Sequence, residues 1–356
     1  MAGRQRHKSR VNSCYFRKEV RKMVRSMFAG VAGLRTHQSK LDVIGNNIAN
    51  VNTWGFKAGS ANFADSLYTN NTNSTGGNAQ MAGGVGGINA SQVGYGVQMS
   101  SISRDFGKST PYSTGRELDV MIDGVGFLIV GSSRGPDEAA NTITGINDTA
   151  FDLKGQAGIS LSRVGILMVD NQGYLVDNSG NYIYGYGVEG NANAAAEPTM
   201  DLTQLVRIKV PGWDQQNDQQ NDPAKNPGDF VTANGDTRYK LQDYKIMSDG
   251  TIVGYTASSE KKITLGKIAL ANVENVNGLE SDSGYYYKMG DNSGVCSVGE
   301  SNAILGTFLG GYLEMPNVDL AKEFSEMITT QRGYQANTKV ITVTDEMLQE
   351  LVNMKR

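Results

Sequence analysis

Apolar side chains recur at alternating spacings of three and four residues at both ends of the chain, and the long middle lacks this pattern. Near the amino terminus, the positions on this spacing are Met27, Val31, Leu34, Gln38, Leu41, Ile44, Ile48 and Val51. Near the carboxyl terminus, they are Phe324, Met327, Gln331, Tyr334, Thr338, Ile341, Asp345, Leu348 and Val352. Such spacing places one stripe along a helix, of the kind that packs against another helix. The two ends are therefore predicted to be helices that pair with each other or with copies of themselves.

The helix boundaries follow from capping signals. The first helix is predicted over residues 27–50 with Ser26 as its N-cap, and the last opens at Asn317 as N-cap and runs to about Asn353. Small residues of the first helix project little from its backbone, so a neighbouring helix can approach closely. These residues are Gly30, Ala32, Gly33, Gly45 and Ala49. The last helix carries a second stripe, formed by Val340, Thr344, Met347, Leu351 and Met354. Two stripes predict more than one helical neighbour, as in a tube of packed helices.

The middle of the chain is rich in Gly, Asn, Thr and Tyr, which favours short strands joined by tight turns. Alternation over Leu118–Ile122 and the apolar run Phe127–Val130 predict strands. Asp-containing turns predict hairpins at residues 170–173, 177–180 and 248–250. The expected fold is a mainly β body with N- and C-terminal α-helices that form a coiled-coil-like inner domain, and the domains are nested and discontinuous along the chain.

Composition shifts give the expected domain boundaries. Residues 1–22 form a basic N-terminal extension with no apolar region after it, so they are not a cleaved secretory signal. They are interpreted as a flexible basic arm or, preferably, as sequence preceding a true start at Met23. The other divisions are a terminal helical domain at 23–55 and 316–356, an extended connector at 56–110, an inner β domain at 111–188 and 243–315, and a small inserted outer domain at 189–242.

Several classes of function receive no support from the residues. The formal net charge of −3 gives no general attraction to nucleic acid, and no apolar run approaches the ~18 residues of a membrane span. Cys14 and Cys296 lie far apart and form no disulfide framework. His7 and His37 have no partner at metal-ligand spacing, and a packing or surface role is expected for His37. No catalytic set, metal site or cofactor motif is found, so a structural role is favoured over a binding role for a β protein, and an enzyme comes last.

Several segments resemble the signatures of the flagellar rod and hook axial proteins. The N-terminal signature is carried by Leu41–Asn50 and Thr53–Lys57, and the C-terminal one by Asn317–Leu320, Gln331–Asn337 and Asp345–Asn353. Thr114–Val120 and Gly124–Phe127 are similar to the start of the family's inner β domain. The resemblance implies a helical tube with terminal helices inside and β domains outside. It also implies a place in the bacterial flagellum, in the hook or basal body, after export by the flagellar type III system.

Within this family, Ser248–Gly254 and Leu265–Asn272 are most similar to hook subunits. The resemblance therefore implies a subunit of the flexible hook that couples rod to filament for motility. The short 189–242 segment keeps the distal rod as the alternative. Implied partners are further copies of the chain, the distal rod protein, the hook cap protein and the hook–filament junction protein. The residues expected at the assembly interface are Leu34, Leu41, Ile44, Ile48, Phe324, Met327, Tyr334, Ile341, Leu348 and Val352.

Overall fold

The computed structural model divides the chain into two compact units. It describes residues 2–77, 86–131, 142–144, 158–170, 173–189, 199–200, 204–209, 229–231, 237–239, 241–256, 262–282, 284–301 and 305–354. The backbone alone is described for residues 2–24, 142–144, 188–189, 199–200, 229–231, 237–239, 241–243, 256 and 262–263. Unit 1 comprises Met1–Val51, Ala58–Asp105 and Val318–Arg356, and unit 2 comprises Asn52–Lys57 and Phe106–Asn317. The protein is mainly β, with one helix at each end, as the sequence predicts.

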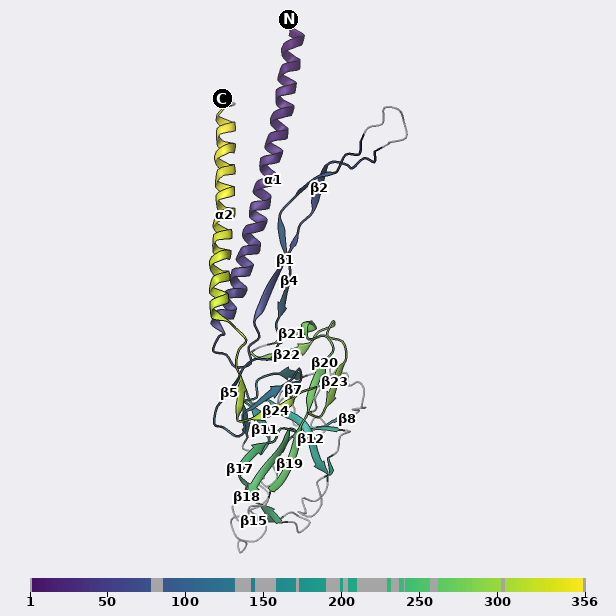
Figure 1. Ribbon diagram of the computed structural model, residues 1–356, viewed down its shortest axis with the longest axis vertical. Coiled ribbons are helices and arrows are strands. Elements are labelled where there is room, and N and C mark those ends of the chain that lie inside the picture. The colour runs from purple at the N-terminus through teal and green to yellow at the C-terminus, as the bar shows by residue number, and fades with distance from the viewer. Residues whose placement is uncertain are drawn as a thin grey trace. The chain divides into compact units, whose positions relative to one another are not determined.

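Unit 1 contains two long helices that lie side by side, α1 (Ala2–Ala49) and α2 (Leu320–Asn353) (Figure 1). The predicted start of α1 at residue 27, with Ser26 as the cap, is wrong, because the helix runs through this position from Ala2. Residues 4–29 contain no Gly or Pro, and their many Arg and Lys residues propagate a helix well. The predicted ends of both helices are confirmed to within one residue.

The N-cap of α2 also differs from the prediction. Asp319, and not Asn317, caps the helix, since its Oδ1 accepts from the N–H groups of Ala321 at 2.9 Å and Lys322 at 3.3 Å. The N–H of Asn317 donates instead to Phe56 O at 3.4 Å. This backbone bond keeps Asn317 in unit 2, and the helix begins two residues later than expected.

Unit 1 also contains two antiparallel ribbons. Strand β1 (Gly59–Asp65) pairs with β4 (Val97–Arg104), with a bulge between Asn62 and Phe63, and β2 (Tyr68–Thr72) pairs with β3 (Ser91–Gly94). The segment expected as an extended connector is therefore paired along much of its described length, and part of the Gly-rich run lies outside the described residues. Contacts of β1 and β4 with α1 give this helix a second neighbour besides α2.

Unit 2 is built on one antiparallel sheet whose main path runs β17-β18-β19-β12-β7-β9-β22-β21. These strands are β17 (Leu241–Ile246), β18 (Thr251–Thr256), β19 (Lys262–Ile268), β12 (Tyr182–Glu189), β7 (Phe127–Gly131), β9 (Ile159–Ser162), β22 (Tyr286–Met289) and β21 (Leu279–Ser281). Strands attached beside this path are β8 (Thr142–Thr144), β10 (Leu167–Val169), β11 (Leu175–Asp177), β13 (Thr199–Met200), β14 (Gln204–Arg207), β20 (Leu270–Val273) and β23 (Cys296–Gly299).

Three separate strand pairs and one short helix are the other elements that the structure describes in unit 2. The pairs are β5 (Pro111–Ser113) with β25 (Tyr312–Glu314), β6 (Val120–Asp123) with β24 (Thr307–Gly310), and β15 (Asp229–Val231) with β16 (Thr237–Tyr239). The short 3-10 helix is η4 (Val276–Gly278).

The core of unit 2 lies on both faces of β7. Leu128 and Val130 belong to one buried cluster, and Phe127 and Ile129 belong to the other. Successive side chains of a strand point to opposite faces of its sheet, and all four of these residues are at most 2% exposed. The predicted buried strand is therefore confirmed, and its uninterrupted apolar run reflects burial on two sides.

The predicted hairpins are also present. Gly173, Gly180 and Gly250 close three turns by donating to Asp170 O, Asp177 O and Met247 O, and each glycine has a φ of +82° or +83°. This left-handed conformation is readily adopted only by glycine, which explains why each turn motif ends on it. Asn171 and Gln172 of the first turn lie outside the described residues.

Much of the expected outer domain at 189–242 lies outside the described residues. Within its described part, β14 pairs with both β12 and β8. Leu205 and Ile208 are buried in the two core clusters. This portion of the segment therefore belongs to the main sheet, because its apolar residues complete the core.

Candidate assembly surface on the terminal helices

The two helices approach each other across small residues. A Cβ atom at Gly33 would lie 2.6 Å from Asn337 Nδ2, and one at Gly333 would lie 2.9 Å from His37 Cε1. At Gly30 the nearest atom would be Ile341 Cγ1, at 3.2 Å. The expected close approach of a neighbouring helix is thus confirmed at Gly30 and Gly33. The order of these contacts shows that α1 and α2 run antiparallel.

The buried line of α2 is polar rather than apolar. Its two buried residues are Thr330 and Thr344, whose hydroxyls donate to the carbonyls of Glu326 and Val340 within the same helix. A threonine bonded in this way satisfies its own polar group and presents a methyl group to the neighbour. The fully buried positions of α2 are therefore polar, whereas its apolar residues are half-buried or exposed.

Asn47 joins three elements of unit 1. Its side chain is 2% exposed, and its Nδ2 donates to Gly59 O at 2.9 Å and to Glu323 Oε1 at 3.1 Å. Its Oδ1 accepts from the Gly59 N–H at 2.9 Å. Burial raises the pKa of Glu323, although the hydrogen bond from Asn47 acts in the opposite direction. Glu326, one turn after Glu323 on α2, pairs with Lys40 at 3.0 Å.

The ribbon of β1 and β4 covers another side of α1. A Cβ atom at Gly96 would lie 3.1 Å from Ala29 Cα, and Thr36 Oγ1 donates to Val97 O at 3.3 Å. The His37 ring packs edge-on against Phe63, with the ring centroids 5.9 Å apart. His37 therefore has a packing role between this ribbon and α2.

Large apolar side chains remain exposed on α2 after these contacts are made. Val352 and Met354 are 64% and 78% exposed. The others of this exposed set are Leu320, Phe324, Ile328, Tyr334, Val340, Val343 and Met347. Apolar surface of this extent on one element is typical of a protein–protein contact.

The residues expected at the assembly interface occupy three environments. Ile44 is buried, and Phe324, Tyr334 and Val352 are exposed. The half-buried ones are Leu34, Leu41, Ile48, Met327, Ile341 and Leu348. Of these residues, Ile341 lies against Gly30 across the helix pair. The sequence analysis did not place four other contact residues at the interface, namely His37, Asn47, Gly333 and Asn337. The pattern that could have identified them is a line of small and polar residues beside the apolar stripe.

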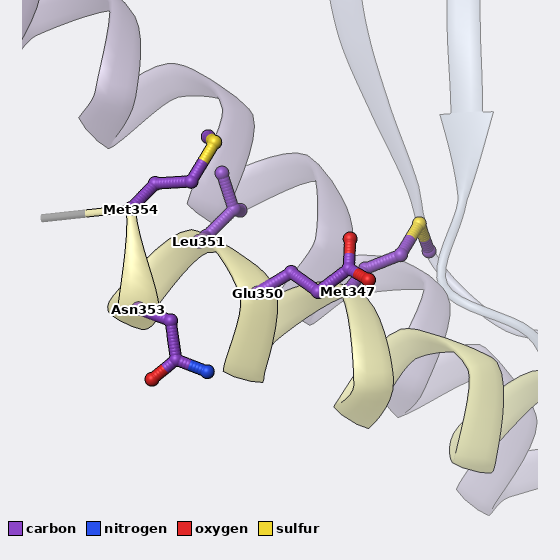
Figure 2. A pocket seen from close by; sticks show the side chains of 5 residues that line it. All are labelled: Met347, Glu350, Leu351, Asn353 and Met354. Atoms are coloured by element: carbon purple, nitrogen blue, oxygen red, sulfur yellow. The ribbon is translucent and has the colours of Figure 1, made fainter.

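A hollow of about 570 Å³ lies at the carboxyl end of α2. Met347, Glu350, Leu351, Asn353 and Met354 line it (Figure 2). Leu351 and Met354 project to one side of the helix and Asn353 to another (Figure 2). Methionine side chains adapt to irregular partners, so this hollow suits an apolar side chain from another helix.

The described residues offer little for other kinds of site. No group of three or more His, Cys, Asp or Glu residues in this part of the chain could hold a metal ion. No helix among the described residues is long and apolar enough to cross a membrane. Cys296 is buried within β23.

The two ends of the chain match known protein families. Residues 27–57 match the family described as flagella basal body rod protein, and residues 309–354 match the flagellar basal body rod FlgEFG protein C-terminal family. Both matched segments contribute helices and contact residues of unit 1 described above. Unit 2, with its large sheet, is called the β unit below. A chain with these terminal helices and this β unit is of the class of flagellar axial proteins.

Whole-chain relatives support the same assignment. The flagellar basal-body rod protein FlgG of Bacillus subtilis is 33% identical over 336 residues, which cover 94% of this chain and all of that protein. The flagellar hook proteins FlgE of Borreliella burgdorferi and Escherichia coli are each 28% identical, and the matches cover 94% and 91% of this chain and 100% and 98% of those proteins. The chain belongs to the flagellar hook and rod axial protein family. It is a structural flagellar subunit and not an enzyme.

Proposed function

We propose that the chain is a subunit of the flagellar hook that assembles with copies of itself into a flexible helical tube. The observation that carries this proposal is the exposed apolar surface of α2 beside a polar contact with α1. In this proposal the terminal helices form a coiled-coil-like inner layer and the β unit lies outside them. The exposed side chains of one copy are covered by helices of its neighbours.

The arrangement of α2 supports two such neighbours. Its buried line, marked by Thr330 and Thr344, already faces α1 within the same chain. On a helical projection at 100° per residue, Phe324 and Val352 lie on one side of that line, and Val340 and Met347 lie on the other. A contact between different surfaces of identical copies that does not close into a ring generates a helical assembly. The proposed interface comprises the nine residues expected from the sequence that are exposed or half-buried in the subunit, without the buried Ile44, together with Ile328, Val343, Met347 and Met354.

The distal rod is the second candidate. Hook and rod proteins both match nearly the whole chain, and the identity of 33% to FlgG of Bacillus subtilis favours the rod. The hook proposal is supported by the resemblance of Ser248–Gly254 and Leu265–Asn272 to hook subunits. Its proposed partners are the distal rod protein, the hook cap protein and the hook–filament junction protein, reached after export by the flagellar type III system.

Immunogold labelling of isolated hook–basal bodies would test this choice. Antibodies raised against the β unit should label the curved segment outside the cell envelope if the chain is the hook subunit. Label confined to the straight segment below the hook would overturn the hook proposal and favour the rod. Sedimentation of the purified full chain tests the assembly itself, because polymers should form above a threshold concentration without any ligand.

A further inference from the structure

A buried charge cluster lies where the two family signatures meet in unit 2. Lys57 is the last residue of the N-terminal match, and Glu314 lies within the C-terminal one. Lys57 Nζ is 2.7 Å from Glu314 Oε1, and their side chains are 0% and 1% exposed. Arg163, equally buried, donates its Nε to Glu314 Oε2 at 3.3 Å. These three residues are separated by more than a hundred positions along the chain.

Backbone hydrogen bonds join the same two segments. The Gly55 N–H donates to Glu314 O at 2.9 Å, and the Asn317 N–H donates to Phe56 O at 3.4 Å. The segment Asn52–Lys57 lies between α1 and β1 in the sequence, and Glu314–Asn317 leads into α2, yet both belong to unit 2. They are therefore the segments through which the β unit is connected to the two helices.

The cluster is also anchored in the β unit itself. Lys57 Nζ donates to Gly107 O at 2.8 Å. Arg163 Nη1 donates to Gly124 O and Gly126 O at 2.8 and 2.7 Å, in the turn between β6 and β7. Replacing a buried ion pair by apolar residues often leaves stability unchanged, whereas such pairs can fix one arrangement of the chain over others. The position of this pair, at the junction of two segments, fits that second role.

We propose that Lys57 and Glu314 form a latch that holds the two connecting segments together, so that they open as a single cooperative unit. Arg163 is the positioning residue that keeps Glu314 oriented when the latch is closed. Both terminal helices are then connected to one joined pair of segments rather than to two independent linkers. This inference concerns the single subunit and does not depend on the proposed hook assembly.

Native-state hydrogen exchange of the wild-type full chain is the first test. With rising denaturant, the Gly55 and Asn317 amides should follow one common curve, because one opening exposes both. The amides of Leu128 and Ile129 in β7 should follow a different curve of higher stability. Two separate curves for Gly55 and Asn317 would overturn the latch.

The second test removes the lysine charge. Lys57→Met keeps an unbranched side chain, and Glu314 retains its contact with Arg163, so no carboxylate is left without a cation. Both amides should exchange faster by about tenfold or more, with β7 unchanged, since a hydrogen bond to a charged group contributes on this order. Lys108→Met, which removes the more exposed pair of Lys108 with Asp123, is the control and should change neither amide.

Three results would contradict the proposal. Protection unchanged at both amides in Lys57→Met would show that the backbone bonds suffice. Faster exchange at Gly55 alone would show that the segments open independently. Equal loss of protection at β7 would show a general stabilising role. If Lys57→Met does not fold, the wild-type exchange curves still decide the question.

Discussion

Single glycines set how closely the terminal helices pack. At Gly33 and Gly333, a side chain would occupy space already filled by Asn337 and His37 of the opposite helix. Gly45 lies on the same helix as Gly33, but a Cβ atom there would have no neighbour within 4 Å. Gly33 and Gly45 therefore have different physical roles, although both lower the helix propensity of the chain by a similar amount.

This difference gives a matched pair of variants. Gly33→Leu should separate α1 from α2 and raise the concentration needed for assembly, because its side chain meets Asn337. Gly45→Leu should instead increase the helix content of the isolated subunit, since it removes a glycine at an open position, with a gain of about 0.5–1 kcal/mol. Circular dichroism and sedimentation measure the two effects. Equal behaviour of the two variants would show that the Gly33 contact does not matter.

Glu323 should make unit 1 sensitive to pH. Burial raises the pKa of this carboxyl above 4.5, so the folded state binds its proton more tightly than the unfolded state does. The free energy of unfolding should then fall as pH rises from about 4.5 through the raised pKa, and level off above it. Glu323→Gln removes this titration and keeps an oxygen that can accept from Asn47.

The test is the difference between wild type and Glu323→Gln in helix stability at several pH values. As pH rises, the variant should become more stable relative to wild type, because wild type must ionise Glu323 at a partly buried site and the variant has no such group. A difference that is constant across this range would contradict the linkage. Both proteins share all other titrating groups, so the comparison isolates Glu323.

At the scale of elements, signals that are local in sequence predicted well. Burial on both faces made β7 a continuous apolar run, and each hairpin glycine followed a turn-forming Asp. The start of α1 was misread because Ser26 can cap a helix, but nothing before it stops one. The cap of α2 was misplaced because Asn317 is held by Phe56, which is 261 positions away in the sequence. Contacts between residues so far apart in the sequence, including that of Lys57 with Glu314, cannot be predicted from the local sequence around either residue.

The cap of α2 can be tested directly. Asp319→Ala removes the acceptor for the N–H groups of Ala321 and Lys322 and should cost about 0.5–2 kcal/mol of helix stability. Hydrogen exchange of these two amides should accelerate accordingly. Asn317→Ala is the control, since its backbone N–H can still donate to Phe56, and it should leave the two amides nearly unchanged. Faster exchange of these two amides in Asn317→Ala than in Asp319→Ala would show that Asn317 is the cap.

At the scale of the whole molecule, the chain combines a β unit that has its own core with helices whose apolar surface is only partly buried. Among the residues whose side chains the structure describes, the core clusters of unit 2 include none from α1 or α2. The helices bury mostly small and polar residues against each other and leave large apolar ones exposed. Folding of the β unit and covering of the helices are therefore expected to be separable, which fits the proposed export of the subunit before its assembly.

Ile328 allows this separation to be tested. It is 53% exposed on α2, so Ile328→Asp should leave the subunit's own packing intact. In an assembled tube, however, the carboxylate would have to be buried among apolar side chains, which is strongly unfavourable without a partner. The variant should therefore melt like wild type in unit 2 but remain monomeric in sedimentation at concentrations where wild type polymerises.

Val125→Asp adds the same charge at an exposed apolar site of unit 2, 52% exposed, and should still assemble. Normal tubes from Ile328→Asp would place this face of α2 outside the assembly contact, and a lowered melting temperature of unit 2 would show that the helix and the β unit fold as one.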